Sequence, residues 1–158
     1  MSDLPSELTF EEIEIGLTKK FNITITQSMV NDFAKLSGDF NPLHVDDEYA
    51  KSTKFKNKIV HGMLLASFLS QMVGMYLPGK YALYTSQSLE FKNPCFVGDE
   101  ITVSSIITDK SNSTKIIKLE SNITNHKNQI LLHGEGRIIV RNDWKFWYRY
   151  RHIKYREF

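Results

Sequence analysis

The sequence predicts a single α+β domain in which a curved antiparallel β-sheet wraps around one long, apolar helix. The first observation behind this prediction is the stretch 59–79, which contains no Asp, Glu, Lys or Arg. The second is a run of four strand-like segments that follows it, separated by turn-rich pieces. The third is the length of 158 residues, which suits one domain with its own core.

The segment before the apolar stretch is predicted to hold a strand and a helix. Residues 21–26 alternate apolar and polar side chains, and a period of two is typical of a strand. Thr26 is a suitable N-cap for a helix over 27–36, because its hydroxyl can accept a bond from a free backbone N–H. Ser37-Gly38 is expected to end that helix.

The next segment, 39–46, is predicted to be a loop. Pro42 has no N–H of its own and disfavours helical backbone at the residue before it. Asp46 or Asp47 can then cap a short helix that runs through Lys51.

The apolar stretch is interpreted as a helix over 59–77 that Pro78-Gly79 ends. It is long enough to suggest a membrane span. Its polar residues instead favour a helix buried inside a soluble protein, and they are His61, Ser67, Ser70 and Gln71.

Four strands are predicted after this helix, at 84–91, 100–108, 114–124 and 129–140. Because they follow one another directly, hairpin-like antiparallel pairing is expected. The helix is apolar on nearly all sides, as expected if the sheet wraps around it.

Composition and charge exclude several classes of protein. Cys95 is the only cysteine, so an intramolecular disulfide and a Cys-rich metal site are excluded, which fits a reducing, cytoplasmic location. The formal net charge of +2 is too small to indicate a nucleic-acid partner. Residues 1–14 are acidic and lack any basic residue, unlike a secretory signal.

Residues 141–158 form a tail that differs from the domain predicted at 1–140. The tail has six Lys/Arg against two Asp/Glu, and seven aromatic residues. It is expected to pack on its own sheet or be partly disordered. Alternatively, it contacts a dimer partner, the adenine or phosphates of a nucleotide, or an anionic membrane. No nucleic-acid motif accompanies it.

Asp39 and His44 are the two polar residues best placed for proton-transfer chemistry. They stand five positions apart on a segment stiffened by Pro42, so both can point into one pocket and hold a water between them. By spacing alone, the same residues also fit a helix cap, a turn or a local hydrogen bond.

Gly62 opens the apolar helix, directly after His61, which is expected to fix the turn into the helix. A helix N-terminus offers free N–H groups and a partial positive charge, and glycine lets a ligand approach the backbone. Such a position suits an oxyanion that develops on a carbonyl. The alternative is a tight turn into a buried helix.

Four spaced motifs together resemble one known family, the MaoC-like (R)-specific enoyl-CoA hydratases of the small, single-domain kind. The motifs are Ser-Gly-Asp-Phe-Asn-Pro-Leu-His-Val-Asp (37–46), Ile-Val-His-Gly-Met-Leu-Leu-Ala-Ser (59–67), Leu-Pro-Gly (77–79) and Ser-Leu-Glu-Phe-Lys-Asn-Pro-Cys-Phe-Val-Gly-Asp-Glu (88–100). The resemblance covers roughly 21–140. It implies a hot-dog fold, a curved sheet around a long helix, and a homodimer with sheets joined edge to edge.

The resemblance also implies roles for individual residues. Asp39 and His44 match the catalytic pair, and Asn41 matches an Asn that orients the loop or the water. Gly62 matches a glycine whose N–H faces the thioester oxygen, and Ser70 matches a serine that supports the aspartate.

The implied reaction adds water to a short trans-2-enoyl-CoA to give an (R)-3-hydroxyacyl-CoA, or removes it. Which of the two catalytic groups is acid and which is base stays open, since the pair titrates as a unit. Six apolar residues of the long helix are candidates for the acyl pocket and equally for the core, namely Met63, Leu65, Phe68, Met72, Val73 and Leu77.

Three alternatives remain at this point. The first is a dehydratase for 3-hydroxyacyl groups on an acyl carrier protein, and the second is a hot-dog acyl-CoA thioesterase. The third is a domain that binds acyl-CoA without catalysis. No cofactor beyond the CoA thioester and no metal is expected, because the remaining histidines lack metal-ligand spacing.

Overall fold

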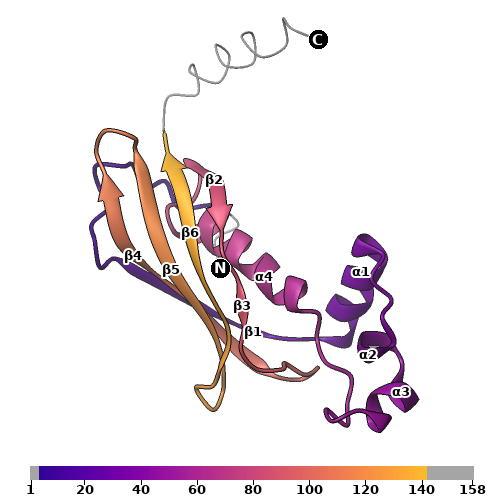
Figure 1. Ribbon diagram of the computed structural model, residues 1–158. Coiled ribbons are helices and arrows are strands. Elements are labelled where there is room, and N and C mark those ends of the chain that lie inside the picture. The colour runs from indigo at the N-terminus through magenta and orange to yellow at the C-terminus, as the bar shows by residue number, and fades with distance from the viewer. Residues whose placement is uncertain (1–3, 142–158) are drawn as a thin grey trace, which may run out of the picture.

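The computed structural model describes residues 4–141, which fold into one curved antiparallel sheet with helices on one side (Figure 1). Apart from Arg141, the tail predicted at 141–158 lies outside the described residues. The sheet order is β1-β4-β5-β6-β2, and β3 also pairs with β6. The strands are β1 (Thr18–Thr24), β2 (Ala82–Gln87), β3 (Glu90–Phe91), β4 (Glu100–Ser111), β5 (Ile116–Asn125) and β6 (Ile130–Val140).

Two groups of helices accompany the sheet. Helix α4 and the π-helical turn η1 lie along one face of the curved sheet, whereas α1, α2 and α3 form a separate group beyond its end (Figure 1). Their bounds are α1 (Gln27–Ser37), α2 (Pro42–Val45), α3 (Asp47–Ser52), α4 (Gly62–Gln71) and η1 (Met72–Tyr76). The predicted fold class, a hot-dog domain, is confirmed.

The core lies between α4–η1 and the inner face of the sheet. Every second residue of β5 from Ile117 to Ile123 is buried, as the alternation of a half-buried strand requires. Leu69 and Met72 pack against that face and are almost completely buried. Burial of each such side chain contributes about 1.5–3 kcal/mol. The hydroxyls of Ser105 and Ser121 lie in the same interior and bond each other at 2.7 Å.

The predicted caps of the first helix are confirmed. The Thr26 side chain accepts a bond from the Met29 N–H at 3.3 Å. Gly38 adopts the left-handed conformation, with φ 76°, and its N–H bonds the Ala34 carbonyl. Asp46 caps α3 through a 3.0 Å bond from the Tyr49 N–H. Strand β1 begins three residues earlier than predicted and ends two earlier.

The prediction of a plain loop over 39–46 is wrong at its centre, where α2 forms. Pro42 occupies the first turn of α2, where its missing N–H costs nothing. Asn41 is the N-cap, and its side-chain oxygen accepts the Leu43 N–H at 2.9 Å. The proline therefore starts a helical turn that carries His44.

The apolar helix begins at Gly62, three residues later than predicted. Val60 donates its N–H to the Cys95 carbonyl at 2.8 Å, and Ile59 forms a β-bridge with Phe96. This pairing holds 59–60 extended, so helical hydrogen bonding starts only after His61. The helix also changes to π-helical geometry over 72–76.

The expected pairing of consecutive strands holds for β4, β5 and β6 and is wrong for the first predicted strand. That strand, 84–91, is interrupted and pairs with β6, while β4 pairs with β1. Residues 92–99 carry the chain across, and Gly98 and Asp99 bond the backbone of Ile25 beside β1. These long-range bonds override a local hairpin.

Helix α4 is not covered on all sides, contrary to the expectation. Leu64, Leu65, Phe68 and Leu69 are buried, whereas Met63 is 56% exposed and Ser67 and Ser70 are exposed. Among residues 4–141, no helix is long and apolar enough to cross a membrane.

Candidate active site

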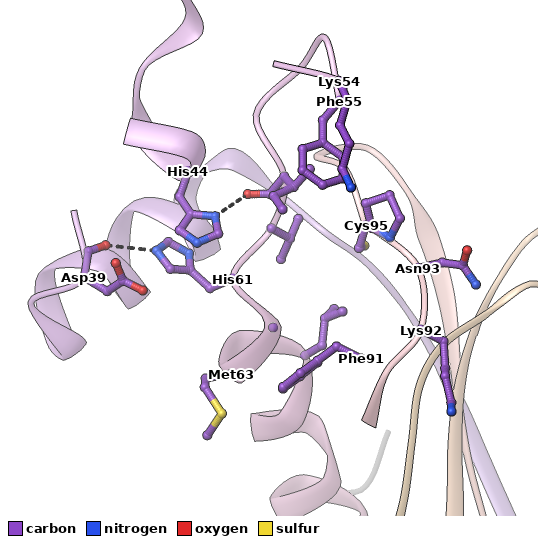
Figure 2. A pocket seen from close by; sticks show the side chains of 15 residues that line it. Asp39, His44, Lys54, Phe55, His61, Met63, Phe91, Lys92, Asn93 and Cys95 are labelled. Carbon is purple, nitrogen blue, oxygen red and sulfur yellow. Dashed lines mark hydrogen bonds between the residues drawn. The ribbon is translucent and has the colours of Figure 1, made fainter. Parts of the chain in front are cut away.

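A pocket of about 500 Å³ lies where the α1–α3 group meets the start of α4 (Figure 2). Asp39, His44 and His61 line one side of it, and Gly62 lies beside them. The opposite wall comes from the segment 91–95, which begins at the last residue of β3. Residues far apart in sequence therefore meet around one space.

His44 is fixed by a hydrogen bond from its Nδ1 to the Ile59 carbonyl oxygen at 2.8 Å. A carbonyl oxygen only accepts, so Nδ1 carries the proton of this bond. The neutral ring therefore has its lone pair at Nε2, which is free to accept a proton. Figure 2 marks this bond with a dashed line and shows the His44 ring next to the ring of His61.

Asp39 lies directly after the left-handed cap at Gly38 and is exposed. Its carboxylate accepts the backbone N–H of Asn41 at 3.2 Å. Its own carbonyl oxygen accepts the Nε2–H of His61 at 3.0 Å. Both ends of the residue are thus held, while the second carboxylate oxygen remains for a ligand.

One donor atom each from Asp39, His44 and His61 lies within 4.8 Å of the other two. Within residues 4–141 this is the group that could hold a metal ion. Imidazoles that share an ion aim their in-plane lone pairs at it, whereas these two rings face each other, with centroids 3.9 Å apart and planes inclined by 30°. The geometry fits two rings in face contact, each held by its own hydrogen bond to a backbone carbonyl, better than a metal centre.

Gly62 begins α4 without a side-chain cap, so the first N–H groups of the helix have no side-chain acceptor. A Cβ atom at this position would lie 2.7 Å from Cε1 of Phe91. Only glycine therefore lets β3 approach the helix start so closely. Gly62 lines the same pocket as Asp39 and His44, so the partial positive charge of the helix N-terminus lies at the pocket wall.

The other predicted site residues are not all brought together. Met63 and Leu65 line the pocket, while Phe68 and Val73 are buried in the core and do not. Ser70 lies on the exposed face of α4, outside the pocket, and no hydrogen bond joins it to Asp39. Asn41 caps α2 and so positions the turn that carries His44.

Sequence reasoning missed part of the lining. Lys54, Phe55, Phe91 and Lys92 border the pocket, and Lys54 lies over the Phe55 ring at 5.1 Å. Four lysines between 51 and 58 were the available signal. Their place near the pocket depends on the fold of the 53–58 turn.

Cys95 also lines the pocket, but its thiol is buried. Burial raises the pKa of Cys95 to about 12, with a further contribution from the nearby Asp99 carboxylate. A thiol of this kind is a packed side chain and a poor nucleophile.

Residues 11–129 match the family model described as MaoC like domain. The chain belongs to the MaoC-like family. It is 40% identical over 129 residues to the (R)-specific enoyl-CoA hydratase of Aeromonas caviae, covering 82% of this chain and 96% of that protein. It is 36% identical over 133 residues to a mitochondrial 3-hydroxyacyl-[acyl-carrier-protein] dehydratase of Arabidopsis thaliana, covering 82% of this chain and 79% of that protein.

Solved structures of MaoC-like proteins resemble the fold closely. The (R)-hydratase from A. caviae superposes with a TM-score of 0.80 at 39% identity, covering 83% of this chain and 99% of that one. The R-hydratase PhaJ1 of Pseudomonas aeruginosa, in unliganded form, superposes with a TM-score of 0.83 at 29% identity, covering 88% of this chain and 89% of that one. The resemblance recognised in the sequence is thereby confirmed.

Proposed function

We propose that this chain is an (R)-specific hydratase of short trans-2-enoyl-CoA thioesters that also catalyses the reverse dehydration. The observation that carries the proposal is the pair Asp39 and His44, with a free carboxylate oxygen and a free Nε2 at one pocket. The pair lies beside the uncapped start of α4. The 40% identity to the A. caviae hydratase supports the same reaction.

In the proposed mechanism, the thioester oxygen accepts the Gly62 N–H, and the helix dipole stabilises the negative charge that develops there. Asp39 and His44 hold a water molecule, whose oxygen attacks C3. One group of the pair accepts a proton from the water, and a proton is delivered to C2. The C2–C3 double bond becomes a single bond, and the elements of water are added.

The test follows the absorbance of the enoyl thioester after purified protein is added to crotonyl-CoA. We expect loss of absorbance with wild type, and near-complete loss of that activity in Asp39→Asn and His44→Gln. Asp32→Asn on α1 and His126→Gln in the β5–β6 turn are matched controls, since both residues are exposed and outside the pocket. Release of free CoA without hydration would identify a thioesterase and overturn the proposal.

An acyl carrier protein is the second candidate carrier. The similarity to the Arabidopsis dehydratase favours it, as do the exposed lysines Lys54 and Lys56 near the pocket, which suit an acidic partner. Equal turnover of a 3-hydroxyacyl carrier protein and the matching CoA ester would support it. A carrier-protein rate far below the CoA rate would exclude it.

We infer that two copies of the chain form a homodimer in the cytoplasm. Exposed apolar side chains at the pocket support a face that a second copy covers, since Met63 and Phe91 are 56% and 52% exposed. Light scattering on the purified protein tests the oligomer, and a monomer would contradict this inference. Cell fractionation tests the location.

A further inference from the structure

Three aromatic rings from separate segments contact one another in tilted arrangements, and one of them belongs to His44 of the proposed catalytic pair. Phe33 of α1 contacts His61, with ring centroids 5.1 Å apart, and His61 contacts His44 of α2 at 3.9 Å. His61 itself precedes α4 and is only 2% exposed. The middle ring therefore joins the α1–α3 group to the helix that lies on the sheet.

His61 also holds the other member of the pair. Its Nε2 donates to the Asp39 carbonyl oxygen at 3.0 Å, which places the proton of the neutral ring on Nε2. Asp39 and His44 are thus attached to the same imidazole, one through a hydrogen bond and one through the ring face. Figure 2 shows His61 between them.

The second nitrogen of His61 makes this arrangement unusual. Nδ1 is buried and, among the side chains of residues 4–141, it is the buried polar atom without a hydrogen-bond partner. A buried polar atom left unpaired is unfavourable, and an apolar ring would fill the same space without that cost. The presence of histidine at this position therefore indicates that its Nε2–H has a role, since an apolar ring has no such donor.

We propose that His61 is a positioning residue that sets the separation and orientation of Asp39 and His44. Its Nε2–H fixes the backbone of Asp39, and its ring is the surface on which His44 rests. This inference rests on the proposed hydratase function. His61 itself does not touch the reacting atoms.

The histidine side chain combines a ring face with an N–H donor, and the proposed role needs both. Phenylalanine offers a ring without a donor, and glutamine offers a donor at the position of Nε2 without a ring. His61→Phe and His61→Gln therefore separate the two contributions, and His61→Leu removes both. Displacement of catalytic groups by about 1 Å can lower a rate by about 100-fold.

The kinetic test measures kcat, KM and thermal unfolding of these variants with crotonyl-CoA. We expect His61→Leu to lower kcat by about 100-fold and His61→Gln and His61→Phe by about 10-fold each, a partial rescue. KM and the unfolding midpoint stay close to wild type. A wild-type kcat in His61→Leu, or a loss confined to KM or to the folded fraction, overturns the proposal.

A second measurement does not depend on activity. Long-range ¹H–¹⁵N correlation spectra of the neutral imidazoles report which nitrogen of each ring carries the proton. We expect the Nε2–H form for His61 and the Nδ1–H form for His44. The Nδ1–H form at His61 overturns the inference even if hydration is confirmed, whereas an inactive wild type with the expected tautomers contradicts only the proposed function.

Discussion

The sheet with α4 and the α1–α3 group are built on different principles. Inward residues of β4, β5 and β6 are almost completely buried, and the central helix packs on them. In α1–α3 only Val30, Ala34 and Ala50 are buried, while Leu36 is 86% exposed. Caps and side-chain bonds hold that group. The proposed catalytic pair, Asp39 and His44, thus lies on the part of the molecule that contributes least to the core.

The sheet with α4 supplies most of the core, whereas the α1–α3 group carries the proposed catalytic pair. Loss of buried apolar surface is the main cost of mutation in the sheet. Loss of a single directed bond is the main cost in the helical group, where few side chains are packed. Mutations in the sheet are therefore expected to lower stability, and mutations in the helical group are expected to lower turnover.

The largest expected effect is on turnover, in Asp39→Asn and His44→Gln. Both groups transfer protons in the proposed reaction, so kcat falls by about 10²–10⁴-fold. Because Asp39 is exposed and His44 only half-buried, the unfolding midpoint stays near wild type. Steady-state assays and thermal unfolding of the same samples check this. A large loss of stability in either variant would contradict the prediction that these residues affect turnover alone.

For Leu69→Ala in α4 we expect the opposite result, a loss of stability with little change in turnover. Leu69 is almost completely buried against the sheet, and its truncation leaves a cavity that destabilises the fold by about 2–5 kcal/mol. Chemical denaturation measures this loss. At low temperature, kcat per folded molecule stays near wild type, since Leu69 does not line the pocket. A kcat reduced tenfold in folded protein would contradict the prediction.

Gly62→Ala acts where the two regions meet. The added methyl group would lie 2.7 Å from Phe91, so the ring must move and destabilise the local packing by about 1–3 kcal/mol. The displaced ring narrows the pocket, and we expect kcat/KM to fall by about tenfold. Combining Gly62→Ala with Phe91→Leu relieves the clash. If this double variant recovers no activity, the clash with Phe91 is not the cause of the lower kcat/KM.

The smallest effect concerns Cys95 at the pocket wall. With a pKa raised to about 12 by burial, the thiol stays protonated at pH 8, and we expect thiol reagents to label it only after unfolding. The unfolded thiol ionises first, so the free energy of unfolding falls as pH rises from 9.0 towards 12. Cys95→Ser lacks this alkaline slope. Rapid labelling of native protein would contradict the assignment.

Local signals predicted much of this structure. The caps at Thr26 and Gly38 depend on side chains and backbone within a few residues, and both were found as expected. The alternation of β4, β5 and β6 likewise reports burial on one face of a strand. The polar pair at 39 and 44 was recognised from its motif, and the pocket contains both residues.

Features that depend on distant contacts were not predictable from local patterns. The late start of α4 follows from the bond between Val60 and Cys95, which are 35 positions apart. The pairing of β2 with β6 depends on the sheet as a whole. His61 appeared to be a turn residue because neither Asp39 nor His44 is adjacent to it in the chain.

The close approach of Phe91 to Gly62 has a consequence for how such proteins diverge. The wall opposite the proposed catalytic pair comes from 91–95, a segment that shares no residue with 39–44, where Asp39 and His44 lie. Selection can therefore alter the size and shape of the space offered to a ligand while the reacting groups stay unchanged. New substrate preferences can arise by substitutions in one short segment at the edge of a sheet.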